Sequence, residues 1–112
     1  MIMNNQWTKT FPTAADDGKW FFLKQDTDSE FPHVQFVEVR LDKKNGKLYL
    51  CECCNQGLEA QSYGIMLSLY EIHNKRYNNT SFCGPVPMPH DFAEIRRQYY
   101  KSKEHRHRVN MV

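Results

Sequence analysis

Residues 33–50 read HVQFVEVRLDKKNGKLYL, and their pattern is the clearest structural signal in the chain. From Val37 to Leu41 apolar side chains alternate with charged ones, which is the period of two expected of a strand with one buried face. Asn45-Gly46 follows, and both residue types tolerate the positive φ of a tight turn. The alternation resumes at Leu48, beyond the turn. The stretch therefore predicts a β-hairpin whose first strand covers His33–Asp42.

The segments on either side of the hairpin predict one further strand and two helices. Aromatic residues at Lys19–Gln25 predict the strand. From Glu59 to Arg76 apolar residues recur every three or four positions, which predicts a helix that is apolar over much of its circumference and therefore largely buried. A second helix is predicted to begin near His90-Asp91. The proline-rich residues 84–89 between the helices predict an extended strap.

These elements define the expected architecture, an α+β fold with a small three-stranded antiparallel sheet, a β-hairpin meander, packed by two C-terminal helices. The length of 112 residues suffices for one core, and we expect a single domain over residues 1–112. Hydrophobic residues at 40% and aromatic residues at 13% support a packed interior. Residues 1–17 are expected to be irregular, and residues 101–112 to form a basic, frayed tail.

The charge balance excludes two classes of protein. Fifteen Lys and Arg residues face thirteen Asp and Glu residues, so the formal net charge is +2. A protein that wraps nucleic acid by charge alone is far more basic. A mimic of the DNA backbone would need a large acidic excess. No stretch approaches the ~20 apolar residues that span a bilayer, and no secretory signal stands at the start, so we expect a cytoplasmic protein without a membrane partner.

No catalytic, cofactor or metal site is predicted. Cys51, Cys53 and Cys54 are clustered and Cys83 lies far along the chain, which is a poor disulfide framework and lacks the second closely spaced pair of a zinc site. We interpret them as reduced, packed thiols, with zinc binding as the alternative that metal analysis would test. Cys83 and a histidine would be the pair for nucleophilic catalysis, but nothing in the sequence brings them together, and we expect no enzymatic activity.

The carboxyl end is the most polarised part of the chain. Residues 90–112 hold six basic residues against three acidic ones, a net charge of +3, whereas the remaining residues carry a net charge of −1. This end suits either a phosphate backbone, with stacking support from tyrosine, or an acidic protein surface. A solvated helix end is the plainer alternative. The predicted partner-binding residues are Arg96, Arg97, Tyr100, Lys101, Lys103, Arg106 and Arg108.

Taken in order, several segments resemble the ArdB/KlcA antirestriction family of plasmids and other mobile elements. The turn into the family's first strand is similar to residues 17–23, DGKWFFL, and its hairpin to residues 39–46, VRLDKKNG. Its apolar helix is similar to residues 62–69, SYGIMLSL, and its last helix to residues 92–96, FAEIR. The sequence departs from the family in lacking most of its amino-terminal region, in its three clustered cysteines and basic tail, and in not being acidic.

The resemblance implies a small non-catalytic inhibitor of host defence, acting on type I restriction enzymes without imitating DNA charge. We therefore expect a binding or inhibitory protein from a phage, plasmid or other mobile element, with a host protein such as a restriction or other defence nuclease as its target. The alternative is a small nucleic-acid-binding protein that uses the basic C-terminal helix.

Overall fold

A computed structural model of the protein describes residues 6–27, 30–54, 59–60 and 64–110, with side chains for 6–27, 30–53 and 64–102. A short 3₁₀ turn, η1, precedes the first strand. The elements in chain order are η1 (Ala14–Asp16), β1 (Trp20–Gln25), β2 (His33–Leu41), β3 (Leu48–Cys54), β4 (Glu59–Ala60), β5 (Ile65–Met66), α1 (Leu67–Tyr77), β6 (Thr80–Val86) and α2 (Phe92–Asn110).

The predicted hairpin is present as β2 and β3. The strands pair antiparallel with Val39 opposite Leu50, and β1 pairs with the other edge of β2. At the turn, Gly46 has a φ of 72° and donates its backbone N–H to the Asp42 carbonyl at 2.7 Å. The prediction of a β1–β2–β3 meander is therefore confirmed.

The expectation of a three-stranded sheet was wrong. In the described residues five antiparallel strands lie abreast in the order β4-β3-β2-β1-β6, and β5 shares the outer edge of β3 with β4. The predicted strap contributes to β6, because its first residues pair with β1. The register of this pair shifts between Trp20 and Phe22, where Gly84-Pro85 is accommodated as a bulge. An edge strand tolerates such a bulge and a proline, and for this reason turn-forming residues did not exclude a strand here.

Helix α1 is shorter and more exposed than predicted. It covers Leu67–Tyr77 rather than Glu59–Arg76, since the chain first runs along β3 as β4 and β5. A Cβ on Gly64 would lie 2.5 Å from the Leu50 carbonyl oxygen, so this close approach requires glycine. The expected burial is also wrong: Leu67 is buried, but Leu69 and Ile72 are 51% and 64% exposed. Part of the predicted helix, residues 61–63, lies outside the described residues.

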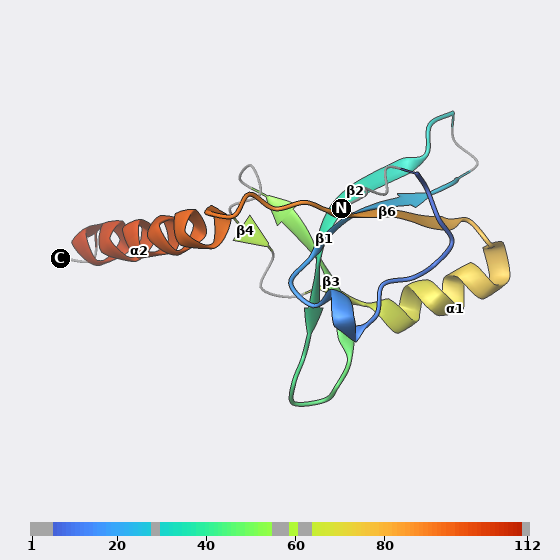
Figure 1. Cartoon of the computed structure of the whole chain (residues 1–112), viewed down its shortest axis with the longest axis horizontal. Coiled ribbons are helices and arrows are strands. Elements are labelled where there is room, and N and C mark those ends of the chain that lie inside the picture. The colour runs from blue at the N-terminus through green and yellow to red at the C-terminus, as the bar shows by residue number, and fades with distance from the viewer. Residues whose placement is uncertain (1–5, 28–29, 55–58, 61–63, 111–112) are drawn as a thin grey trace.

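The core lies on one side of the sheet, where α1 packs (Figure 1). Its buried side chains come from four strands and from α1. They are Phe21, Leu23, Val37, Val39, Leu50, Leu67, Tyr70 and Phe82. Because side chains alternate along a strand, the intervening residues of β1 and β2 point to the opposite side, which we call the open face. The open face comprises Trp20, Phe22 and Lys24 of β1 and Val34, Phe36, Glu38 and Arg40 of β2.

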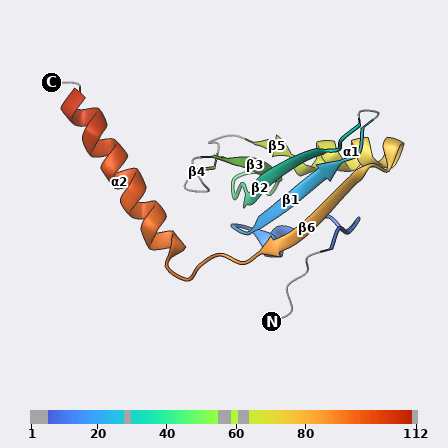
Figure 2. The same ribbon diagram turned by 90° about the horizontal axis from the view of Figure 1, so that it is seen from above.

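Helix α2 leaves the body of the protein. It follows β6 by a short connector and extends away from the sheet in both views (Figures 1 and 2). It begins at Phe92, close to the predicted start, and its backbone stays helical to Asn110. The expectation of a basic, frayed tail over residues 101–112 stays a prediction, since residues 111–112 and the side chains beyond residue 102 lie outside the described set. The predicted irregular N-terminal segment holds η1 and an isolated bridge between Thr8 and Phe82.

Candidate binding surface around helix α2

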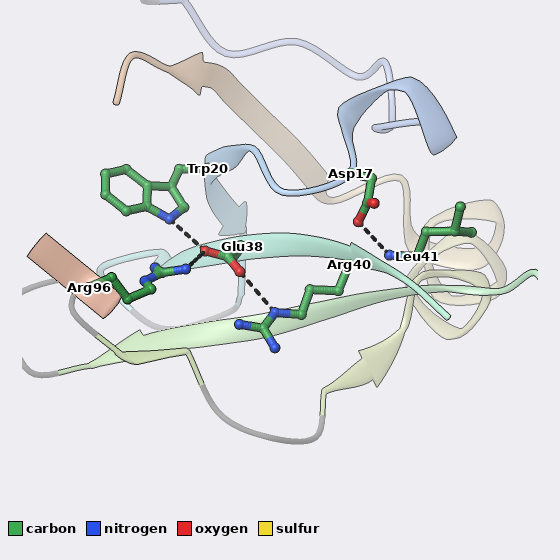
Figure 3. Close-up of polar contacts among 6 residues, drawn as sticks. All are labelled: Asp17, Trp20, Glu38, Arg40, Leu41 and Arg96. Carbon is green, nitrogen blue, oxygen red and sulfur yellow. Dashed lines mark hydrogen bonds and ion pairs between the residues drawn. The ribbon is translucent and has the colours of Figure 1, made fainter. Parts of the chain in front are cut away.

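A buried carboxylate joins α2 to the sheet. Glu38 is 3% exposed and accepts three hydrogen bonds from side chains (Figure 3). The indole Nε1 of Trp20 donates to Oε1 at 3.0 Å, and Nη1 of Arg96 donates to the same oxygen at 2.8 Å. Nε of Arg40 donates to Oε2 at 2.8 Å. Burial of a carboxylate is tolerated when it is hydrogen-bonded and paired in this way.

The local sequence explains how these groups meet. Trp20 and Glu38 are directly opposite in the β1–β2 register, and Arg40 is two residues further along the same face of β2. Arg96 follows Phe92 by four residues, so both lie on one side of α2. The Phe92 ring packs edge-on against Trp20 with centroids 4.4 Å apart, and the Arg96 guanidinium lies 4.8 Å from the Phe92 ring centre. An apolar contact and an ion pair thus anchor the first turns of α2.

Two guanidinium groups face one carboxylate at this point, so the cluster retains a positive charge. Burial lowers the pKa of Arg40, but the hydrogen bond and the charge of Glu38 outweigh it, and the pKa is raised overall. Burial also raises the pKa of the neighbouring Cys51 thiol, against the opposing influence of Arg40. The thiol is therefore held in its neutral form, which is the less reactive one.

A groove of about 460 Å³ runs along the joint between α2 and the sheet. One wall comes from the body, through Gly18 and Glu38. The other walls come from the connector and from α2. Their lining residues are Met88, Pro89, His90, Phe92, Ala93, Arg96, Arg97 and Tyr100. The lining includes the apolar side chains of Met88, Pro89 and Phe92 and the cations Arg96 and Arg97 of α2.

The seven predicted partner-binding residues all lie on α2, but in different surroundings. Arg96 is 18% exposed at its side chain and serves the Glu38 ion pair. Arg97 is exposed and donates to Glu94 at 2.9 Å, which raises the pKa of Arg97. Tyr100 is 38% exposed, lines the groove and contacts Tyr99, and Lys101 is exposed. The remaining three belong to α2 with side chains outside the described set: Lys103, Arg106 and Arg108.

The sequence reasoning missed the anchor itself. In a strand with one buried face, polar residues are expected to face water, and Glu38 was read in that way. One signal was available in the sequence. Trp20 can pair with Glu38, and a buried indole N–H usually donates a hydrogen bond to an acceptor. The distance in sequence between Glu38 and Arg96 left no local sign of their contact.

The described residues hold no group of three or more metal-ligand side chains. Cys51, Cys53 and Cys83 form no disulfide, and the side chain of Cys54 lies outside the described set. In the part of the chain that the structure describes, no helix is both long and apolar enough to cross a membrane.

Comparisons with profiles of known protein families, with curated proteins and with solved structures give no significant match. The resemblance to the ArdB/KlcA family therefore rests on the residues of this chain alone.

Proposed function

We propose that the protein is a small non-catalytic binding protein of a phage, plasmid or other mobile element. It inhibits a host protein such as a restriction or other defence nuclease, and α2 is the element that contacts this target. The observation that carries the proposal is the geometry of α2. The helix is anchored to the sheet at Phe92 and Arg96, and beyond that anchor Arg97, Gln98 and Lys101 are exposed.

The composition of α2 favours an acidic protein surface as its target. Between Phe92 and Asn110 there are six basic residues and two acidic ones. Complementary charge steers association and sets its orientation. The exposed Ile95 and Tyr100 add apolar contact area next to these cations, which a protein interface uses in its centre.

The length of α2 also supports a binding role. Most of the stability of a helix in a protein comes from tertiary packing, and the ring contact and the ion pair that join α2 to the sheet lie in its first turns. A partner that packs along the rest of α2 would add to this packing. The order of segments shared with the ArdB/KlcA family points to a target among the restriction enzymes.

The second candidate is a nucleic-acid-binding protein that uses α2. The six cations and the adjacent Tyr99 and Tyr100 favour it, since cations neutralise phosphates and tyrosine rings stack on bases. In that case binding weakens steeply with salt, and the Arg106→Ala/Arg108→Ala double variant lowers the slope. A binding constant that does not change with salt would exclude this candidate.

Affinity capture from a bacterial lysate, with and without nuclease treatment, tests the proposal. We expect a restriction or other defence nuclease that stays bound after nucleic acid is digested. A variant with Lys101→Gln, Arg106→Gln and Arg108→Gln should lose it, because glutamine keeps the helix propensity and removes the charge. The matched control is Lys43→Gln/Lys44→Gln/Lys47→Gln on the β2–β3 hairpin. If digestion leaves no nuclease bound and only ribosomal or nucleoid proteins were recovered before it, the proposal is overturned in favour of the second candidate.

A further inference from the structure

The open face of the sheet carries a row of aromatic rings. Phe22 and Phe36 are directly opposite in the β1–β2 register, with ring centroids 5.0 Å apart. On the other side of β1, Phe22 is opposite Cys83 of β6. Beyond β6 the N-terminal segment adds Trp7, because its neighbour Thr8 pairs with the core residue Phe82 and alternation turns Trp7 to the open face. Phe36 and Phe22 thus lie side by side on β2 and β1, and Trp7 adds a further ring beyond β6, which itself places Cys83 opposite Phe22.

The rings in this row are accessible. Trp7 is 42% exposed and Phe22 is 39% exposed, and Val34 beside them is 51% exposed. Figure 2 looks onto the side of the sheet away from α1, and of the described helices α2 alone touches that side, at its start. Phe36 also contacts Trp20, with centroids 5.4 Å apart, so the rings continue without interruption to the anchor of α2.

Basic side chains lie at both ends of this row of rings. The Lys24 ammonium lies 4.7 Å from the centre of the Trp7 ring. At the other end, Arg40 and Arg96 share the single carboxylate of Glu38, which leaves an excess of positive charge. Helix α2, with six basic residues, starts from the same face. The open face therefore combines flat aromatic surface with positive charge at both ends of the row.

We propose that the open face binds single-stranded nucleic acid by stacking bases on Trp7 and Phe22. Exposed aromatic rings on an antiparallel sheet are suited to unstacked bases, and every base offers a π-face whatever the sequence. Lys24 and the cluster of Arg40 and Arg96 would lie near the phosphates. This surface is separate from the outer part of α2 and goes beyond the proposed function.

The charge distribution favours this occupant over a second copy of the chain. A second copy related by a two-fold axis would place its own positive open face against this one, which brings like charges together. A polyanion with flat apolar rings complements both the aromatic rings and the positive charge of the open face. A single strand fits better than a duplex, because the bases of a duplex are stacked on each other and offer no free rings.

Tryptophan fluorescence with a short oligo(dT) tests the proposal directly. The chain has two tryptophans, and Trp20 is 7% exposed, so quenching by the oligonucleotide reports on Trp7. We expect quenching that saturates and a Phe22→Ala variant that binds about tenfold more weakly, the usual loss for one stacking ring. Lys24→Ala should reduce the salt slope by about 0.7, as expected for one lost phosphate contact on a single strand.

The matched control is Ile72→Ala, which removes an apolar side chain of 64% exposure from α1 on the other side of the sheet and should leave binding unchanged. Because Phe22 and Ile72 are both exposed, both variants are expected to fold, and thermal unfolding checks this. Absence of quenching, equal binding of Phe22→Ala and wild type, or equal affinity for a duplex of the same length would each overturn the proposal. If the face instead binds a protein, the oligonucleotide does not quench the tryptophan fluorescence.

Discussion

At the scale of single residues, Glu38 holds the two parts of the molecule together. Its carboxylate is 3% exposed and is stabilised by donors from β1, β2 and α2 (Figure 3). The donors and the carboxylate depend on one another, because removing one partner of a buried charge leaves the remaining groups without full compensation. The residue that alternation places on the water-facing side of a strand is thus one of the least exposed polar residues described.

Glu38→Gln should destabilise the protein by about 3 kcal/mol, since two guanidinium groups lose their counter-charge in a partly buried site. Chemical denaturation with a constant m value measures this. Glu94→Gln is the matched control, because its ion pair with Arg97 lies on the surface, and we expect no measurable change there. Equal stability of Glu38→Gln and Glu94→Gln would contradict the role given to Glu38.

Cys51 gives a pH dependence with a defined sign. Burial raises the pKa of its thiol, so the unfolded chain releases this proton at a lower pH than the native protein does. The free energy of unfolding should therefore fall as the pH rises above the ordinary pKa of a cysteine thiol, and the contribution is complete below it. Urea denaturation across this range should show a smaller decline for Cys51→Ala than for wild type. Parallel declines in the two proteins would rule the thiol out as a source of the effect.

At the scale of elements, α1 and β6 show why part of the fold could be read from the sequence and part could not. The β2–β3 hairpin was predictable because its pairing is local and Asn45-Gly46 marks its turn, where Gly46 takes a positive φ. β6 was not, because it pairs with β1, more than fifty residues earlier, and its Gly84-Pro85 bulge has the composition of a loop. The period of α1 indicated a helix correctly, but the prediction that it is largely buried was wrong, because an apolar side chain does not show whether a neighbouring element covers it.

Two leucines of α1 test the orientation of the helix. Leu67→Ala should cost about 3 kcal/mol, because Leu67 is 5% exposed and packs in the core. Leu69→Ala, two residues along and 51% exposed, should change the free energy of unfolding by less than about 0.5 kcal/mol. Thermal or chemical unfolding measures the change in the free energy of unfolding for each variant. Similar costs for both would mean that α1 is buried on both sides, as the sequence alone predicted.

At the scale of the whole molecule, the charge segregation seen in the sequence corresponds to a spatial separation. The basic segment is a helix that leaves the body, and the body holds one described core under one side of the sheet. The predicted site residues fall together on α2, but Arg96 has an internal role that no local pattern indicates. The sequence could place the cations on a helix. It could not show that Glu38 forms an ion pair with Arg96, which lies 58 residues further along the chain.

Plating of unmodified phage on a host with an active type I restriction system measures the proposed inhibition in cells. Expression of the wild-type protein should raise the efficiency of plating at least about tenfold. The Lys43→Gln/Lys44→Gln/Lys47→Gln variant should match wild type, and the Lys101→Gln/Arg106→Gln/Arg108→Gln variant should restore restriction. No rise with the wild-type protein would contradict the proposed function, and full activity of the α2 variant at equal protein level would contradict the assignment of the target-binding surface to α2.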